Sequence, residues 1–379
     1  MADRETELLA RIASGVGPLD PAEWDSIAGQ HPFVGHAFLS ALEDSGSVGP
    51  GTGWTPAPLL IENDRGKPIA AAPAYLKTHS QGEYIFDHVW ADAWERAGGA
   101  YYPKLQIAVP FTPVPGPRLL GSRPQQLLAA AEAVTVQNEL SSAHITFLDE
   151  PEAQEAEQRG WLIRHGLQYH WFNHGYRDFG DFLAALSSRK RKAIRKERAA
   201  AQEGLEFRAL RGAEIGAAEW DAMWRFYQDT GSRKWGRPYL TRSFFDLIGG
   251  WMGDALLLFL AYRNGLPVAG ALNVIGLDAL YGRYWGTVDE VRFLHFELSY
   301  YQAIEWAIDH GLQSVQAGAQ GEHKLARGYE PVITRSAHFI PNPSFQRAVD
   351  QFLVEERSAV AAEAEWCRQQ LPYRSSSSE

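Results

Sequence analysis

Two stretches of the chain alternate apolar runs with short polar turns, and each predicts a set of β-strands. The first, LLIENDRGKPIAAAPAYLK, begins at Leu59, and the second, LLFLAYRNGLPVAGALNVIG, begins at Leu257. In both, an apolar strand leads into a turn with a glycine and then into a second strand rich in small residues. Such turns are typical of hairpins, because Gly and Asn accept positive φ at little cost. A third strand with aromatic residues is predicted to follow, ending near Trp90 or Trp285.

The same order of three strands in both halves indicates a duplicated unit. Apolar residues at helical spacing predict helices around the strands, over residues 21–42, 124–141, 182–201, 218–230, 296–310 and 343–368. A short strand is predicted over Ser314–Ala317. Helices packed over a mostly antiparallel sheet make an α+β fold. We expect one domain at 1–165 and a second at 166–345, followed by a C-terminal helix and tail at 346–379.

Composition agrees with this picture and narrows the function. A chain of 379 residues exceeds what one hydrophobic core usually organises. The net charge of −10 argues against bulk nucleic-acid binding but leaves room for a local basic patch. The single cysteine, Cys367, excludes an intrachain disulfide and favours a reducing compartment. The longest apolar runs are only of strand length. We therefore expect a cytoplasmic protein without a membrane span, and its oligomeric state is undetermined.

Several longer strings resemble one bacterial family. They are HPFVGHAFLSALEDSGSVGPGTGW, YYPKLQIAVPFTPVPGPRLL, KWGRPYLT, LYGRYWG, LHFELSYYQAIEWAI and AGAQGEHKLARGYEP. From about His31 to about Arg368, the chain is similar to the Fem-like predicted N-acyltransferases, which are labelled as peptidoglycan biosynthesis or recognition proteins. The resemblance implies two Gcn5-related N-acetyltransferase-like domains in tandem. It also implies transfer of an amino acid from aminoacyl-tRNA onto an amine of a peptidoglycan precursor.

The segment 316–328, which follows the predicted Ser314–Ala317 strand, is the best candidate for an active site. Acyl transfer to an amine needs a proton acceptor, a grip on the carbonyl group and donors for the developing oxyanion. The candidate catalytic residues are Glu322, His323 and Lys324. Candidate substrate-binding residues of the same segment are Gln320, Gly321 and Arg327. The resemblance adds that Fem-type enzymes carry a Lys followed by a Gly-aromatic pair here, as Lys324 and Gly328-Tyr329 do. A solvated loop with ordinary charges is the alternative.

Further candidates lie on the third strand of the second half. Tyr281, Arg283 and Trp285 are predicted to alternate onto one face, where they would contact substrate. A buried strand rarely places an arginine among aromatic residues without a partner. The partner is either a phosphate or carboxylate of the substrate, or Glu297 in a structural pair. The pattern of His295 and Glu297 is too common to indicate a metal, and no metal site is expected.

Two other segments carry clustered cations. In the predicted loop KWGRPY, Trp235 and Arg237 are suited to stack on and pair with a nucleotide or sugar, or else to pack the loop down. The stretch from Arg189 to Arg198 holds seven Lys or Arg residues and one acid. Such a cluster suits the phosphates of a tRNA, and a solvated helix face is the alternative.

In the first half, Asp87 and Trp90 end the predicted third strand, and Lys104 follows it. The resemblance implies that these residues bind substrate in a cleft shared by the two halves. The residues alone show only charges and aromatic rings near a sheet edge, and the two interpretations stay open.

The connection after the third strand bears on the donor. Acetyl-CoA-dependent members of the fold usually carry Arg/Gln-x-x-Gly-x-Gly/Ala here, and the backbone amides of that loop bind pyrophosphate. In this chain the connection reads TVDEVRFLH from Thr287, with two acids and no glycine, which disfavours CoA.

These features predict an N-acyltransferase or aminoacyltransferase that requires no cofactor. An amine of a small molecule or cell-wall precursor would attack the activated group directly, with aminoacyl-tRNA or acyl-CoA as the donor. One alternative is a CoA-dependent N-acyltransferase with an altered CoA site. Another is a binding or recognition protein that keeps the fold without catalysis.

Overall fold

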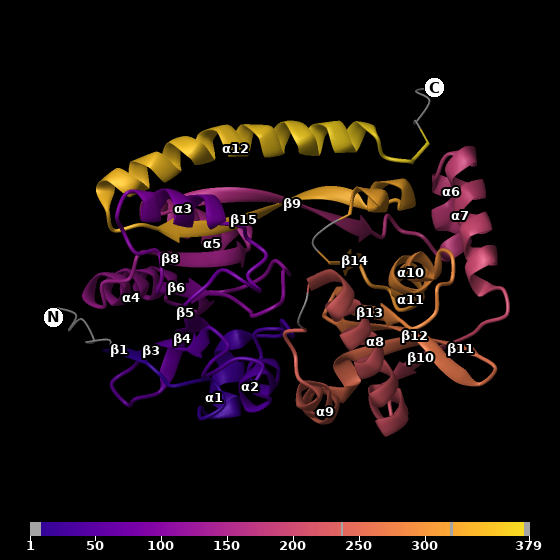
Figure 1. Cartoon of the computed structure of the whole chain (residues 1–379), viewed down its shortest axis with the longest axis horizontal. Coiled ribbons are helices and arrows are strands. Elements are labelled where there is room, and N and C mark those ends of the chain that lie inside the picture. Colours follow the sequence, from indigo (N-terminus) through magenta and orange to yellow (C-terminus); the bar gives the residue numbers. More distant parts are fainter. Residues whose placement is uncertain (1–8, 236–237, 319–320, 375–379) are drawn as a thin grey trace, which may run out of the picture. The chain divides into compact units, whose positions relative to one another are not determined.

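The computed structural model describes residues 9–235, 238–318 and 321–374, and the chain divides into two compact units (Figure 1). Unit 1 comprises residues 1–166, 239–244 and 333–361, and unit 2 comprises residues 167–238, 245–332 and 362–379. The chain first leaves unit 1 within strand β9 (Leu162–Phe172) and re-enters it late within strand β15 (Glu330–Phe339). The units are therefore interleaved along the sequence, unlike the consecutive ranges 1–165, 166–345 and 346–379.

Unit 1 contains two runs of strands with helices around them. The first run has the order β15–β8–β6–β5–β2, with β8 (Ala143–Leu148), β6 (Lys104–Ile107), β5 (Ala74–Lys77) and β2 (Trp54–Pro56). The second has the order β1–β3–β4–β7, with β1 (Leu9–Ile12), β3 (Leu59–Glu62), β4 (Pro68–Ala72) and β7 (Leu120–Gly121). The helices are α1 (Pro21–Ala28), α2 (His36–Asp44), α3 (His88–Arg96), α4 (Pro124–Gln137), α5 (Glu150–Gln158) and most of α12 (Pro343–Gln369).

Unit 2 is built on strands in the order β10–β11–β12–β13–β14–β9. The new strands are β10 (Glu206–Arg211), β11 (Leu256–Arg263), β12 (Leu266–Ile275), β13 (Ala279–Thr287) and β14 (Ser314–Ala317). The helices are α6 (Phe179–Ala185), α7 (Ser188–Gln202), α8 (Ala217–Trp235), most of α9 (Arg242–Trp251), α10 (Leu294–Phe296) and α11 (Gln302–Asp309). Between α10 and α11 lies a π-helical segment, Glu297–Tyr301.

Helices cover both faces of the unit 2 sheet. On one face α8 packs so closely on β13 that a Cβ added to Gly286 would lie 2.1 Å from the carbonyl oxygen of Phe226. On the other face Trp285 packs against His295 of α10, with ring centroids 5.1 Å apart. The predicted α+β class is therefore confirmed. None of the helices in the described ranges combines the length and apolar composition of a membrane span.

Each unit repeats a strand, a helix and a parallel strand. In unit 2, β13 is followed by α11 and then by β14, which pairs with β13 in parallel. In unit 1, β6 is followed by α4 and then by β8, which pairs with β6 in parallel. The duplicated unit expected from the sequence is thus visible in the strand order. The strand that corresponds to β13 is β6, however, and not the predicted strand ending near Trp90.

The prediction of a third strand near Trp90 is wrong, because this segment forms the start of α3. Trp90 and Ala91 of α3 are buried in one cluster with Phe345, Val349 and Leu353 of α12. Burial of these rings against α12 outweighs the strand propensity of the aromatic run, since tertiary packing readily overrides local preference.

The predicted hairpins at both turns are confirmed. Between β11 and β12, Asn264 and Gly265 have φ of 51° and 76°. Positive φ at both central residues gives the turn whose twist matches that of the flanking strands.

Two predicted helices are each divided in the structure. The predicted helix at 21–42 is broken between α1 and α2, where Gly29 has φ of 72° and Trp24 Nε1 donates to the carbonyl of Val34 at 2.8 Å. The predicted helix at 182–201 is replaced by α6 and α7, with Leu186 in an extended conformation between them.

Candidate functional site

Strands β13 and β14 of unit 2 are parallel neighbours that separate part-way along their length. They pair as far as Gly282 and Ala317, and β13 then continues to Thr287 while β14 ends. The register of β13 against β12 shifts next to Gly282, which makes Arg283 the extra residue of a β-bulge. Past this point, every second N–H of β13 points toward the side on which β14 has ended. The bulge and the strand end therefore leave backbone donors there that β14 does not engage.

A cavity of about 120 Å³ lies at this separation. Its walls come from β12, from β13 between Gly282 and Trp285, from Ala317 and Gly318 after β14, and from the helical segments after β13. Ser299 and Tyr300 line it from the π-helical segment. A π-helical turn within a helix is rare and is frequently found at functional sites.

Two polar side-chain atoms at the cavity have no hydrogen-bond partner in the part of the chain that the structure describes. They are Oδ1 of Asn273, a residue only 1% exposed, and Oγ of Ser299. Buried polar atoms are almost always paired, and leaving one unpaired costs about 1–3 kcal/mol. The two atoms therefore favour a polar ligand in this cavity.

Lys324 lies directly behind the cavity wall. The segment Glu322–Arg327 is a 3₁₀ helix, and the Lys324 side chain is almost fully buried beneath it. Its Nζ donates to the carbonyl oxygen of Gly318, a lining residue, at 2.6 Å. Burial lowers the pKa of Lys324 to about 7. The amine holds the chain after β14 in place, and a substantial fraction of it is uncharged near neutral pH.

The other candidates of the segment 316–328 have different surroundings. His323 is exposed on one side, and its Nε2 lies 2.9 Å from the hydroxyl of Tyr300. Glu322 is exposed. Arg327 is buried, donates to Glu197 at 2.8 Å and stacks over the ring of Phe296. Its guanidinium is thus committed to structural contacts.

The last two candidates of this segment are Gly321 and Gln320. Gly321 has φ of 121°, and a Cβ there would lie 2.6 Å from the ring of His323. The position therefore requires glycine. Gln320 lies outside the described residues.

The predicted common face of Tyr281, Arg283 and Trp285 is wrong. Because the bulge adds one residue at Arg283, the alternation changes face between Gly282 and Tyr284. Trp285 faces α10, whereas Tyr284 packs against Tyr227 of α8 on the opposite face. Arg283 and Trp285 both line the cavity, and Tyr281 does not.

Glu297, the structural partner considered for Arg283, is engaged elsewhere. Its carboxylate is buried and pairs with Arg198 of α7 at 3.0 Å, and it also accepts from Gln202 and Gln302.

The predicted loop at 234–239 is partly helical, because α8 continues through Trp235. The side chain of Trp235 and the whole of Arg237 lie outside the described residues.

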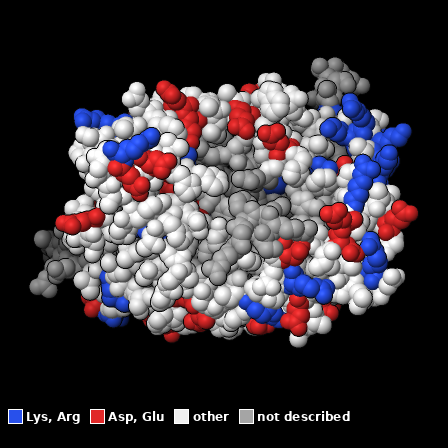
Figure 2. Space-filling model, viewed as in Figure 1, with Lys and Arg blue, Asp and Glu red and all other residues white. Residues whose placement is uncertain are grey.

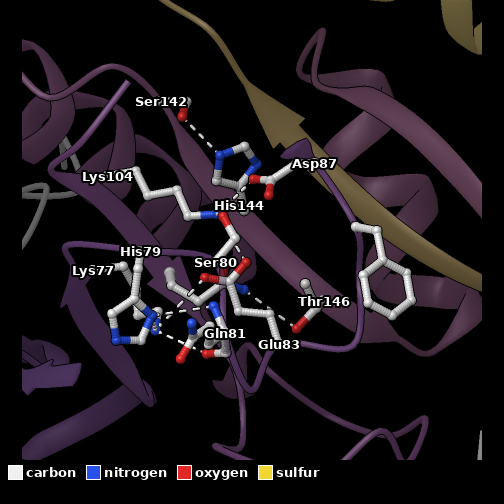
Figure 3. Close-up of polar contacts among 12 residues, drawn as sticks. Lys77, His79, Ser80, Gln81, Glu83, Asp87, Lys104, Ser142, His144 and Thr146 are labelled. Atoms are coloured by element: carbon white, nitrogen blue, oxygen red, sulfur yellow. Dashed lines mark hydrogen bonds and ion pairs between the residues drawn. The ribbon is translucent and has the colours of Figure 1, made fainter. Parts of the chain in front are cut away.

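Asp87 and Lys104 form a buried ion pair in unit 1 (Figure 3). The Nζ of Lys104 lies 2.5 Å from Asp87 Oδ2 and 2.8 Å from Glu83 Oε2, and it also donates to Ser80 at 2.9 Å. Burial would lower the pKa of Lys104, but the two carboxylates outweigh it and raise the pKa. Burial likewise opposes ionisation of Asp87, yet Lys104 holds its pKa well below the usual range. These charges are paired inside unit 1.

A second lysine joins the same network. The Nζ of Lys77 lies 3.8 Å from Glu83 Oε1 and 3.7 Å above the ring of Trp54. Burial lowers the pKa of Lys77 to about 7 and raises the pKa of Glu83 to about 7. Trp90, the remaining candidate of the first half, packs its ring against His338 at a centroid distance of 4.9 Å.

The basic stretch from Arg189 to Arg198 lies within α7. Arg189, Lys192, Arg195 and Lys196 are exposed, and Figure 2 shows Lys and Arg side chains gathered along the edge where α7 runs. Arg198 instead points inward to Glu297 and Glu305. Of these exposed cations, Arg189 lies in the first turn of the helix, where it opposes the helix dipole. In the described part of the chain, no three His, Cys, Asp or Glu side chains are grouped as metal ligands.

Among the lining residues that sequence reasoning missed are Asn273, Ser299 and Tyr300. Asn273 did carry a signal, since it is a lone polar residue within the apolar strand sequence GALNVIG. Ser299 and Tyr300 carried none, because their orientation depends on the π-helical segment.

Comparisons with known proteins identify relatives of this fold. The profile of the FemAB-like family, described as peptidoglycan biosynthesis/recognition, matches residues 15–375. The chain is similar to the crystal structure of FemX, with 13% identity, a TM-score of 0.54, and 91% of this chain and 100% of FemX covered. It is also similar to the C-terminal domain of a putative lysylphosphatidylglycerol synthetase from Agrobacterium fabrum, with 10% identity, a TM-score of 0.51, and 88% and 95% covered.

A third similar structure is a conserved protein of unknown function from Bacteroides thetaiotaomicron, with 11% identity, a TM-score of 0.51, and 88% and 99% covered. A comparison with curated protein sequences finds no match. At these identities the likeness concerns the fold. The expected arrangement of two acetyltransferase-like units in tandem is confirmed by the repeated strand–helix–strand order and the match to FemX.

Proposed function

Because this chain belongs to the FemAB-like family, we propose that it is a transferase that moves an activated acyl or aminoacyl group onto an amine. The observation that carries the proposal is the cavity where β13 and β14 separate. It combines backbone donors of β13 with side-chain atoms that have no partner among the described residues.

The cavity offers what the reaction requires. The nitrogen of a neutral amine attacks the carbonyl carbon, a C–N bond forms, and the carbonyl oxygen gains negative charge. The N–H groups of β13 past Gly282 would stabilise that oxygen. The bond to the leaving oxygen or sulfur then breaks, and the leaving group takes up a proton as the amine loses one.

Tyr300 and His323 provide a path for the proton. Tyr300 lines the cavity, and burial keeps its pKa well above the usual value, so the hydroxyl stays protonated. The hydroxyl is hydrogen-bonded to His323, whose imidazole reaches solvent. General acid–base transfer of this kind typically contributes 10²–10⁴-fold to a rate. In this scheme Lys324 positions Gly318 at the cavity wall and is not itself in contact with the reacting atoms.

For the donor we propose an aminoacyl-tRNA, and for the acceptor an amine of a peptidoglycan precursor. The exposed cations of α7 support a polyanionic donor, because a cluster of Lys and Arg side chains on one helix suits the phosphates of a nucleic acid. An acyl-CoA is the alternative donor.

The test is a transfer assay with the full chain, using either charged tRNA or acetyl-CoA with a soluble precursor that carries a free amine. Gly282→Val places a side chain at the cavity, and we expect it to lower the transfer rate by about 10²-fold. Gly250→Val is the control, because a Cβ at that exposed helix position meets nothing within 4 Å.

Transfer by the wild type from tRNA but not from CoA would support the proposed donor. Equal rates for Gly282→Val and wild type would contradict the assignment of the cavity. Precursor binding without transfer from either donor would instead identify a recognition protein.

A further inference from the structure

Glu297 and Gln302 lie one π-helical turn apart, and two hydrogen bonds join them. The backbone N–H of Gln302 donates to the carbonyl oxygen of Glu297, five residues earlier. The side chains repeat this contact, because Nε2 of Gln302 donates to Oε1 of Glu297 at 2.9 Å. On an α-helix, residues five apart lie about 140° apart around the axis and do not face each other. The side-chain bond therefore fits the π-helical turn and not a continuous α-helix.

The π-helical turn also determines where Tyr300 points. On an α-helix, residues three and four apart share a face, so Glu297, Tyr300 and Tyr301 would all face α7. In the structure Glu297 and Tyr301 do face α7, where the hydroxyl of Tyr301 donates to Glu197. Tyr300 instead lines the cavity, and its hydroxyl lies 2.9 Å from Nε2 of His323. An α-helical turn would rotate Tyr300 toward α7, away from both the cavity and His323.

The carboxylate of Glu297 is itself fixed from α7. It is fully buried and accepts from Nη2 of Arg198 at 3.0 Å and from Nε2 of Gln202 at 2.9 Å. A buried carboxylate with these donors keeps one orientation, because any other orientation leaves a charge unpaired. Of the three residues that donate to it, Arg198 and Gln202 belong to α7, and Gln302 belongs to the turn. The bond from Gln302 is therefore the one that ties the turn to this fixed point.

We propose that Glu297 and Gln302 are a positioning pair, which holds the π-helical turn and so keeps the hydroxyl of Tyr300 at the cavity and against His323. The inference rests on the proposed function and adds the residues that orient its proton path. Neither Glu297 nor Gln302 lines the cavity, so the pair acts on the reaction through Tyr300.

Two amides donate to the same oxygen of Glu297 at the same distance, and they give a matched pair of variants. Gln302→Leu removes the donor of the turn, and Gln202→Leu removes the donor of α7. Each variant leaves the ion pair between Glu297 and Arg198 in place. If Gln302→Leu fails to fold, Gln302→Asn takes its place, because its amide is one methylene too short to reach Glu297. Gln202→Asn is then the control.

The first readout is the NMR signal of the His323 imidazole in the full chain with labelled histidine, which does not depend on turnover. His323→Gln identifies this signal by removing it. Tyr300→Phe gives the signal of the imidazole without the hydroxyl contact. We expect Gln302→Leu to show the signal of Tyr300→Phe, and Gln202→Leu to show the signal of the wild type.

The second readout is the transfer assay described above, with kcat and KM measured separately. We expect Gln302→Leu to lower kcat by about 10²-fold, as Tyr300→Phe does, because both lose the proton path. KM should change by no more than about twofold, since the lost contact acts in the transition state. Gln202→Leu should keep both constants of the wild type.

The proposal is overturned if the His323 signal of Gln302→Leu stays at the wild-type position, or if Gln202→Leu moves it as far. An equal loss of kcat in the two variants would also overturn it, because the effect would then come from Glu297 losing any donor. The expected NMR signals without transfer by any protein would contradict the proposed function and leave the positioning of Tyr300 standing. Transfer by the wild type that Gln302→Leu leaves unchanged would do the reverse.

Discussion

At the scale of single residues, unit 1 contains a balanced set of buried charges. Lys77 and Lys104 face Glu83 and Asp87, and all four side chains are nearly inaccessible to solvent. Two positive and two negative groups cancel when all are charged, and they also cancel if Glu83 takes the proton of Lys77. Such a network tolerates proton exchange but not the loss of a member, because the remaining charge has no solvent to stabilise it.

Removing one member should therefore be costly. Lys104→Met leaves Glu83 and Asp87 without their closest cation, and we expect a loss of about 3–5 kcal/mol in the free energy of unfolding. Urea denaturation at neutral pH measures it. Lys67→Met, at an exposed turn position, is the matched control and should change the value by no more than about 0.5 kcal/mol. Equal stability of the two variants would mean that the network contributes little.

At the scale of elements, the sequence predicted best where local chemistry decides the structure. The turn at Asn264 and Gly265 was predicted correctly from its residue types. The helices α11 and α12 were predicted correctly from their apolar spacing. Both signals act over only a few residues. The strand predicted near Trp90 failed because α12, more than 250 positions away, buries the ring.

For the candidate site, too, the sequence predicted some features and missed others. Arg283 and Trp285 were found because an arginine among aromatic residues is visible in the sequence. The faces of β13 on which they lie were not predicted correctly. A one-residue bulge reverses the alternation of side chains between the two faces of the sheet, and nothing in the sequence marks it.

The packing of β13 against α8 gives an element-scale prediction. A methyl group at Gly286 would overlap the backbone of Phe226, which cannot turn aside as a side chain does. Gly286→Ala should lower the free energy of unfolding by about 1–3 kcal/mol. Thermal or urea unfolding measures the change.

Gly250→Ala provides the comparison, because it adds the same methyl group in open space on α9. It should leave stability unchanged or raise it by up to about 1 kcal/mol. If both variants were equally stable, α8 would be free to move away from β13.

At the scale of the whole molecule, the two units do not correspond to two halves of the sequence. Strand β8 of unit 1 pairs with β15, whose residues arrive after all of β10 to β14. Helix α3 of unit 1 is likewise buried by α12. A fragment that ends at the first crossing between units lacks both partners.

Cutting the chain after residue 166 should therefore not release a folded unit 1. We expect residues 1–166 alone to be unfolded or aggregated, since an edge of β8 and the apolar side of α3 are uncovered. Joining 333–361 to this fragment through a flexible linker should restore cooperative unfolding, followed by circular dichroism. A cooperative transition for 1–166 alone would show that β15 and α12 are dispensable.

The interleaved chain also has a consequence for how the protein is made. Residues 1–166 of unit 1 are synthesised before unit 2, yet the last segment of unit 1 is complete only at residue 361. At 5–20 residues per second, roughly 10 to 40 s separate the synthesis of β8 from that of its partner strand and helix. Throughout that interval β8 lacks its partner strand β15, and the apolar side of α3 is not covered by α12. Both are then exposed to other chains. We therefore expect the yield of this protein to depend on chaperone supply more than that of a protein whose domains finish one after another.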